Sequence, residues 1–347
     1  MLKGSWEKLT LQFKQPSGTS RGVLTEKDSW LIKIWDDKNP DIYGIGEASI
    51  IKTLSPDWNL SYESKINTVC QNISEYDSIR KLETLNTYPS IQFAIETALL
   101  DLQNGGKSII FKSGFTNQNE PILINGLIWM GTKNFMLSQI KEKIEAGFSC
   151  IKLKIGAIDF ETELEILKYI RTTFSEKDIE IRVDANGAFT PNNALHQLEQ
   201  LSKFSLHSIE QPIKQGQIEE MYQLCRKTPL PIALDEELIG VFDKDSKTNL
   251  LSHIQPQYII LKPSLIGGFK GTDEWVELAK QQKINWWITS ALESNIGLNA
   301  IAQYTFTKNN PLPQGLGTGQ LFTNNTNLHH CNKSLQIKNG MLYLAGF

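Results

Sequence analysis

Several common signatures are missing from this 347-residue sequence, and each absence excludes a class of protein. It has only four cysteines, widely separated and without a Cys-x-x-Cys pair, which argues against a zinc site and favours free thiols. No apolar run approaches the roughly 20 residues of a membrane span. The first residues lack the apolar core of a secretory signal, and no basic stripe offers a nucleic-acid surface. We therefore expect a cytoplasmic protein with neither a nucleic-acid nor a membrane partner.

The composition is that of an ordinary globular protein, with 40% hydrophobic and 21% charged residues and a net charge of -3. The length suits one large domain and one smaller domain. We place the smaller one in residues 1–118, with residues 321–347 returning to it, and the larger one in residues 119–320. The sequence leaves the oligomeric state open.

The first part of the chain predicts a sheet followed by helices. The runs LTLQF, SWLIKIWD and YGIGEAS alternate apolar and polar residues at period two, which is typical of strands. Between residues 62 and 104 apolar residues recur at spacings of three and four, which predicts helices. Residues 15–22, QPSGTSRG, predict a mobile loop, and we interpret Arg21 as solvated rather than as a substrate ligand. The pattern indicates an α+β unit.

After residue 120 short β-branched runs alternate with helical stretches. The strand candidates are residues 122–128, 150–156, 179–184, 207–210, 232–235, 258–262 and 286–290, with a weak eighth at 313–317. Helices are predicted near 132–146 and 159–174, and from Pro191 onward with Thr190 as its cap. Eight such units predict an α/β fold with a (β/α)8-type barrel. A doubly wound open sheet is the alternative.

Charged residues end five consecutive strand candidates. In chain order they are Lys154, Asp184, Glu210, Asp235 and Lys262. Because the carboxyl ends of barrel strands meet at one mouth, we expect these side chains to converge there. Burying five charges together is costly unless their charge is compensated. A divalent cation bound between the three carboxylates would provide that compensation. Mg²⁺ prefers such oxygen ligands, and Mn²⁺ would also fit.

The two lysines flank the predicted metal site and suggest a reaction. Removing a proton beside a carboxylate creates an enediolate, whose charge a metal stabilises. A lysine that acts as the base must titrate below its usual pKa of about 10.4, and nearby cations lower that pKa. Lys152 shares a strand face with Lys154, so together with the metal it would help keep Lys154 neutral. The residues thus predict a metal-dependent enzyme that takes a small-molecule carboxylate as substrate.

Five motifs resemble those of the enolase superfamily, and more narrowly of its muconate-lactonizing group. They are KLKIG (152–156), RVDANGAF (182–189), IEQPI (209–213), ALDEEL (233–238) and ILKPSLIGG (260–268). The stretches GIGEAS (44–49) and QFAIETALLDL (92–102) are similar to the capping domain of that family. The resemblance implies that Lys154 is the base, that Asp184, Glu210 and Asp235 bind the metal, and that Lys262 is the opposing lysine.

Within that group, SALESNIGL (290–298) and GLGTG followed by LF (315–322) resemble the o-succinylbenzoate synthases of menaquinone biosynthesis. The resemblance implies dehydration of a cyclohexadiene carboxylate, in which Lys154 moves the proton and Lys262 stays protonated. Substrate contacts are predicted for Lys152, Arg182, Asn186, Ser290, Glu293 and Ser294. The alternative for Ser294 is a helix cap.

Other reactions would use the same five charged residues. An N-acylamino acid racemase would employ both lysines on opposite faces of the substrate, and a muconate cycloisomerase also stays open. A dipeptide epimerase of this group would usually carry Asp-x-Asp where this sequence has Gly-Leu-Gly-Thr-Gly. A barrel that binds metal or ligand without catalysis is the alternative of another class, and the presence of all five residues disfavours it.

Overall fold

The computed structural model describes residues 1–19, 22–76 and 79–346. Its N-terminal sheet pairs β1 (Leu2–Thr19), β2 (Gly22–Asp36) and β3 (Asn39–Ser49) in antiparallel order. Alternate residues of β2, among them Trp30, Ile32 and Ile34, pack against α1 (Tyr62–Gln71) and α3 (Pro89–Gln103). Shorter helical segments are η1 (Ile73–Tyr76), α2 (Ile79–Leu82), η2 (Glu83–Leu85) and α4 (Gly114–Asn117). This sheet and its helices form the predicted α+β unit, which we call the cap.

Residues 15–19 and Gly22, for which a mobile loop was predicted, belong to strands. Residues 15–19 continue β1 after a register shift between Gln12 and Ser17, and Gly22 begins β2. Gly18 also forms a bridge to Met130, at the mouth of the barrel. The stretch is extended because its backbone groups find partners on β2 and on the barrel, which composition alone does not reveal. Residues 20 and 21, and with them the prediction for Arg21, lie outside the described residues.

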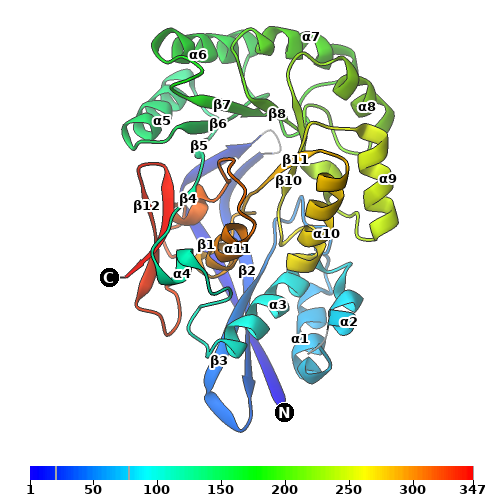
Figure 1. The fold of residues 1–347 in the computed structure, drawn as a ribbon, viewed down its shortest axis with the longest axis vertical. Coiled ribbons are helices and arrows are strands. Elements are labelled where there is room, and N and C mark those ends of the chain that lie inside the picture. The colour runs from blue at the N-terminus through cyan, green and yellow to red at the C-terminus, as the bar shows by residue number, and fades with distance from the viewer. Residues whose placement is uncertain (20–21, 77–78, 347) are drawn as a thin grey trace.

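The larger part of the molecule is built around a parallel sheet of seven strands, and neighbouring strands in this sheet are consecutive in the sequence. Its strands are β5 (Gly126–Ile128), β6 (Cys150–Lys154), β7 (Glu180–Asp184), β8 (Ser208–Glu210), β9 (Ile232–Leu234), β10 (Tyr258–Leu261) and β11 (Asn285–Ile288). The helices between and after them are α5 (Lys133–Glu145), α6 (Phe160–Thr173), α7 (Pro191–Ser202), α8 (Ile218–Lys227), η3 (Glu236–Leu238), α9 (Lys244–Ile254), α10 (Gly268–Gln281), α11 (Asn295–Thr307) and η4 (Gly317–Gln320). Figure 1 shows α5 to α9 as an arc outside the strands, with the hairpin of β1 and β2 running up from the N-terminus toward the barrel strands.

The predicted barrel is confirmed, although its eighth strand is reduced to two bridges. Gln314 pairs with Ile124, and Gly315 pairs with Thr289, both in parallel. These bridges link the end of β11 to the segment just before β5. The alternative, a doubly wound open sheet, is therefore not the architecture.

The run at residues 122–128 does not form one strand. Its first part is β4 (Ile122–Leu123), which pairs antiparallel with β13 (Met341–Gly346), and β12 (Lys333–Lys338) completes this small sheet. Just before it, the C-terminal segment runs along the cap, since Lys14 N donates to Leu321 O and Thr323 N donates to Gln12 O. The tail therefore contacts both the cap and the start of the barrel domain.

Strand alternation decides which side chains enter the barrel. Ile151 and Leu153 of β6, like Ile181 and Val183 of β7, belong to the core between strands and helices. The residues between them therefore point to the barrel interior. Within the described ranges, no helix is long and apolar enough to cross a membrane.

Candidate active site

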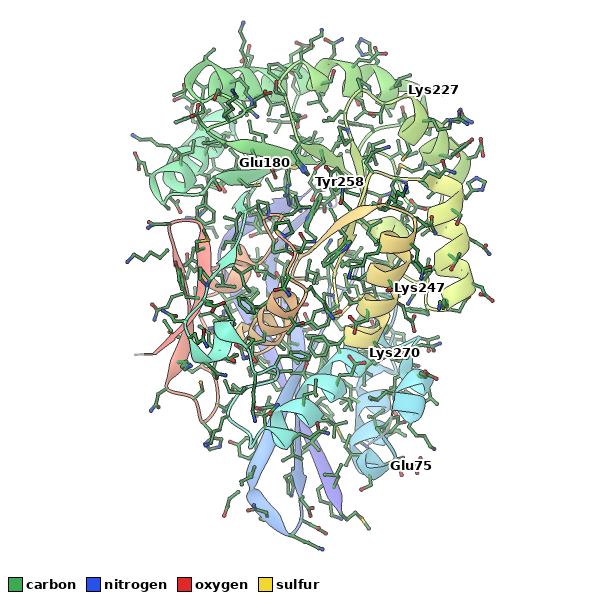
Figure 2. All side chains as sticks on the ribbon, in the orientation of Figure 1. Glu75, Glu180, Lys227, Lys247, Tyr258 and Lys270 are labelled. Atoms are coloured by element: carbon green, nitrogen blue, oxygen red, sulfur yellow. The ribbon has the colours of Figure 1, made fainter. Side chains whose placement is uncertain are left out.

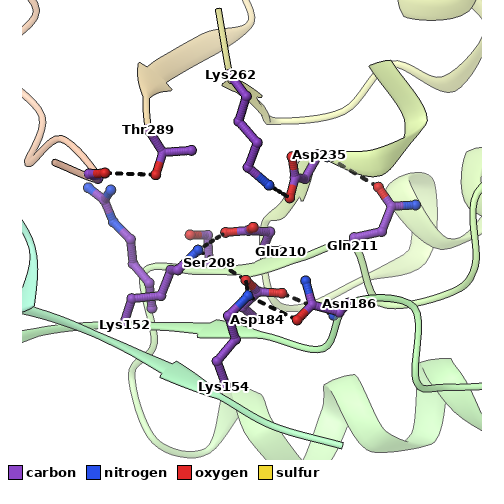
Figure 3. Close-up of polar contacts among 12 residues, drawn as sticks. Lys152, Lys154, Asp184, Asn186, Ser208, Glu210, Gln211, Asp235, Lys262 and Thr289 are labelled. Atoms are coloured by element: carbon purple, nitrogen blue, oxygen red, sulfur yellow. Dashed lines mark hydrogen bonds and ion pairs between the residues drawn. The ribbon is translucent and has the colours of Figure 1, made fainter. Parts of the chain in front are cut away.

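The five charged residues predicted from the strand ends converge at one mouth of the barrel. Lys154, Asp184 and Glu210 end β6, β7 and β8, and strand pairing sets them side by side. Asp235 and Lys262 directly follow β9 and β10. Figure 3 shows Lys154 and Lys262 reaching from opposite sides toward the three carboxylates. The spacing of one strand and one helix between these residues therefore produces the predicted constellation.

Lys152 and Lys154 share one carboxylate. The Nζ atom of Lys152 lies 3.0 Å from Asp184 Oδ2 and 2.7 Å from Glu210 Oε2. The Nζ atom of Lys154 lies 2.5 Å from the same Asp184 oxygen and donates to Asn186 Oδ1 at 2.9 Å. Asn186 thus gives the head of Lys154 a second partner besides Asp184.

Lys262 has its own carboxylate partner, because its Nζ donates to Asp235 Oδ2. A glutamine positions that partner: Gln211 Oε1 accepts from the backbone nitrogen atoms of Asp235 and Glu237, at 3.1 and 3.3 Å. Gln211 has a φ of 38°, in the left-handed region that a glutamine seldom adopts. A strained backbone of this kind persists only where its surroundings over-determine it.

The surroundings shift the pKa values of the two flanking lysines, Lys154 and Lys262, in opposite directions. Burial lowers the pKa of Lys154, and the nearby charges of Lys152 and Lys262 add to this against the attraction of Asp184. Burial also acts to lower the pKa of Lys262, but the carboxylates around it, Asp235 first, raise the pKa above its usual value. Lys154 is therefore the lysine that more readily becomes neutral.

The three carboxylates are crowded and buried. Burial, and then the charge of Asp184, raise the pKa of Glu210 well above its usual value. Burial alone would raise the pKa of Asp184, but Lys152 and Lys154 hold it well below its usual range. Such crowding of like charges is characteristic of sites that hold a cation or carry out proton chemistry.

The donor set fits a hard divalent cation. Glu210 Oε1 and Asp235 Oδ1 are buried and have no hydrogen-bond partner among the residues that the structure describes. Unsatisfied buried oxygens are costly, and a divalent cation would satisfy them. In the same residues, no group of three or more Asp, Glu, His or Cys side chains is arranged to hold a metal ion as it stands. The lysine ammonium groups instead bind the carboxylates.

A cavity of about 210 Å³ opens beside the three lysines. Its polar lining residues include Asn125, Thr289, Ser290 and Thr318, and its apolar ones include Leu24, Leu54, Leu127, Trp129 and Leu292. The first two leucines belong to the cap and the other residues to the barrel domain. The cavity therefore lies between the two, with the mixed lining expected of a site for a small organic ligand.

Residues 136–345 match the family model described as Enolase C-terminal domain-like. The chain belongs to the enolase superfamily. An o-succinylbenzoate synthase from Desulfotalea psychrophila is 46% identical over 351 residues, which cover 92% of this chain and 94% of that protein. The crystal structure of MenC from Desulfotalea psychrophila LSv54 matches with a TM-score of 0.86 at 42% identity, covering 99% of each chain. The predicted superfamily and its predicted branch are thereby confirmed.

Other superfamily members are epimerases. An L-Ala-D/L-Glu epimerase from Francisella tularensis subsp. novicida is 27% identical and covers 86% of this chain and 85% of its own. A dipeptide epimerase from Enterococcus faecalis, solved with Mg and the dipeptide L-Leu-L-Tyr, has a TM-score of 0.82 at 19% identity, with coverage of 99% and 97%. At that identity the likeness shows the fold. The bound Mg is a property of that Enterococcus protein.

Of the six residues predicted to contact substrate, Lys152 and Ser290 line the cavity. Arg182 is 1% exposed and lies deeper in the barrel. It donates to Glu180 Oε1 at 2.7 Å and Pro313 O at 2.8 Å, and its guanidinium lies 4.1 Å from the ring centroid of Trp287. Figure 2 labels Glu180, the first residue of β7, at the opposite end of that strand from Asp184. Arg182 therefore contacts the barrel wall and not the cavity lining.

Glu293 and Ser294 are engaged in the loop that follows β11. Ser294 is the N-cap of α11 and accepts from Ile296 N, so the helix cap considered for it is confirmed. Glu293 accepts from Ala291 N and from Ser264 Oγ. Asn186, as described above, contacts Lys154.

Several residues of the site escaped the sequence-based prediction. Gln211 directly follows Glu210 within the motif IEQPI, so the motif could have indicated that it belongs to the site. Nothing in the motif reveals its contact with the Asp235 backbone. Leu24 and Leu54 carried no signal, because they reach the cavity only when the cap docks on the barrel.

Proposed function

We propose that this chain is an o-succinylbenzoate synthase. It would convert a succinyl-hydroxycyclohexadiene carboxylate to o-succinylbenzoate through an enediolate, a step of menaquinone biosynthesis. The observation that carries this choice is the 46% identity to the Desulfotalea synthase over 92% of the chain, against 27% for the epimerase. The geometry of the mouth independently supports proton abstraction beside a carboxylate.

Lys154 is the proposed base. Its lowered pKa increases the fraction of free amine at neutral pH, which a general base requires. It would take the proton beside the substrate carboxylate and then deliver a proton to the departing hydroxide on the same face. Asn186 Oδ1, 2.9 Å from Nζ, would hold the amine in place during both transfers.

Lys262 is the proposed electrostatic partner. Its raised pKa keeps the ammonium charged while negative charge builds on the enediolate oxygens. It approaches from the side opposite to Lys154 (Figure 3), so it need not exchange a proton in a dehydration. A racemase would require Lys262 to act as acid or base in turn.

Asp184, Glu210 and Asp235 would hold Mg²⁺, and Mn²⁺ would suit the same oxygen ligands. When bound, the cation would supply Lewis acidity at the substrate carboxylate. The three side chains would have to turn toward a common point and exchange lysine contacts for the metal. Glu210 Oε1 and Asp235 Oδ1, which have no hydrogen-bond partner within the described part of the chain, support this proposal.

A side-by-side assay tests the proposal. Purified protein with Mg²⁺ is given the cyclohexadiene substrate, followed by the absorbance of the aromatic product, and separately an N-succinyl amino acid, followed by loss of optical rotation. We expect dehydration to have the higher kcat/KM. Faster racemisation would replace the proposal by a racemase. Magnesium binding without either reaction would favour a barrel that binds ligand without turnover.

A further inference from the structure

A buried carboxylate of the cap reaches the barrel at the start of α11. Glu47, on β3, is 0% exposed. Its Oε1 accepts from Ser29 Oγ at 2.6 Å and from Ser294 N at 2.9 Å. Its Oε2 accepts from Ser294 Oγ at 2.5 Å and from Gly297 N at 3.0 Å. Because Ser29 lies on β2, this one side chain ties two cap strands to the first turn of a barrel helix.

A second buried carboxylate joins the loops that follow β10 and β11. Glu293 Oε1 accepts from Ser264 Oγ at 2.5 Å, two residues beyond Lys262, and its Oε2 accepts from Ala291 N at 2.7 Å. Between these loop residues, Leu292 has a φ of 64°, which a leucine rarely adopts. Strain of this kind persists where the surroundings over-determine the conformation, and the two bonds of Glu293 do so here.

The two carboxylates meet at Gly297. A Cβ atom at this position would lie 2.8 Å from Glu293 Cβ and 2.9 Å from Glu47 Oε2, which leaves no room for a side chain. Lys27 is buried beside them and donates to Ser29 Oγ at 3.2 Å, so its charge offsets part of their negative charge. The site is thus closely packed and cross-linked between cap and barrel.

We propose that Glu47 and Glu293 are positioning residues that set the register of the cap on the barrel and thereby shape the substrate cavity. Neither carboxylate lines that cavity. Glu47 acts through β2, which carries the wall residue Leu24, and through Ser294. Glu293 acts through the strained loop that carries Ser290 and Leu292 and through the segment after Lys262.

The sharpest variant is Glu47→Gln. An amide accepts at one oxygen only, so its nitrogen would face a donor such as Gly297 N–H and the link to α11 would weaken. With the substrate of the proposed function, we expect KM to rise about tenfold while kcat stays within about threefold, because the wall shifts and the lysines do not. Gly297→Ala, which displaces both carboxylates by sterics, should have the same effect.

Glu96→Gln is the matched control. Glu96 is also a buried cap carboxylate at the start of a barrel helix, since its Oε2 accepts from Phe269 N at 2.5 Å on α10. Its hydrogen bonds with Gln92 and Phe269 reach neither β2 nor the loop at residues 290–294. It should lower thermal stability and leave KM unchanged.

Hydrogen exchange supplies a readout that does not depend on turnover. In Glu47→Gln, peptides covering residues 22–29 and 290–297 should both exchange faster, while peptides of β6 and β7 stay protected. Faster exchange at 290–297 alone, with KM unchanged, would make Glu47 a simple helix cap and overturn the proposal. The inference rests on the proposed function for its kinetic part only. If the wild-type protein dehydrates nothing, the exchange experiment still decides, and Gly297→Ala replaces Glu47→Gln should the latter not fold.

Discussion

The two flanking lysines are the same residue type in unequal surroundings. Lys154 shares Asp184 with Lys152, so burial and neighbouring positive charge prevail and its pKa falls. Lys262 holds Asp235 and lies near two further carboxylates, so its pKa rises in spite of burial. Strand-end spacing predicted that these residues converge. Which lysine is the more neutral follows from side-chain contacts that spacing does not contain.

Lys154→Ala should abolish turnover while magnesium still binds. Removing a general base typically costs about 10²- to 10⁴-fold in rate, and this residue is proposed to act in two proton transfers. The measurement is kcat with the cyclohexadiene substrate, together with calorimetric titration of Mg²⁺. Lys133→Ala is the control, because Lys133 is an exposed lysine paired with Glu165. Turnover near the wild-type rate in Lys154→Ala would remove the mechanism.

A second cavity of about 320 Å³ adjoins the active-site cavity. Both cavities are lined by Asn125, Leu127, Trp129 and Gly317. The backbone of Trp129 is clamped by Gln139, which donates to its carbonyl and accepts from its N–H, each at 3.0 Å. Trp129 therefore belongs to the lining that the two spaces share, and its backbone is held in place.

Trp129→Ala should join the two cavities and relax substrate size selection. We expect kcat/KM for an analogue with a bulkier side arm to improve about tenfold relative to the cyclohexadiene substrate. Steady-state kinetics with both compounds measure this ratio. Trp129→Phe keeps an aromatic ring at this position and should change the ratio little. An unchanged ratio in Trp129→Ala would mean that other residues limit the substrate.

At the scale of elements, the sequence pattern predicts the bounds of a strand well where the whole run belongs to one sheet. It predicts them poorly where the two halves of a run belong to different sheets. The run at 179–184 follows one charged residue, Asp178, and ends on another, Asp184, and it matches β7 within one residue. The run at 122–128 looks continuous, yet it splits into β4 and β5 because β4 pairs with β13 near the other end of the chain. The extension of β1 through residues 15–19 likewise depends on β2 and Met130. Strand pairing between segments so far apart in the sequence cannot be predicted from local composition.

Helix α6 offers a test of local capping. Asp159 is its N-cap and its Oδ2 accepts from Thr162 N at 3.1 Å. Asp159→Ala should lower the free energy of unfolding by about 1 kcal/mol, because a first-turn N–H loses its acceptor. Urea denaturation followed by circular dichroism measures the loss. Asp159→Asn retains an acceptor and should stay close to the wild type, so equal losses in both variants would point to charge rather than capping.

At the scale of the whole molecule, buried acids should make stability depend on pH. Burial raises the pKa of several carboxyl groups, among them Asp57 and Asp101 to about 6, and Glu96 and Glu163 to about 7. Between their usual pKa and these values the folded protein binds more protons than the unfolded chain, so stability falls as pH rises and then levels off. Burial lowers the pKa of His207 and His329, which acts in the opposite direction. Because these carboxyl groups outnumber the two histidines, we expect a higher Tm at pH 5 than at pH 7.5 by differential scanning fluorimetry.

Substitution of Asp57 measures the contribution of one carboxyl group to this pH dependence. Its Oδ2 accepts from Ser90 N and Ser90 Oγ, whereas its buried Oδ1 has no partner among the described residues. Asp57→Asn therefore retains both bonds through its carbonyl oxygen and removes the titration. A shift from 3.8 to about 6, at about 1.4 kcal/mol per unit, corresponds to roughly 3 kcal/mol lost by the wild type on going to neutral pH. The Tm difference between pH 5 and pH 7.5 should shrink in Asp57→Asn and stay the same in the exposed control Asp41→Asn. An unchanged difference in Asp57→Asn would show that this carboxyl group is ionised throughout the range.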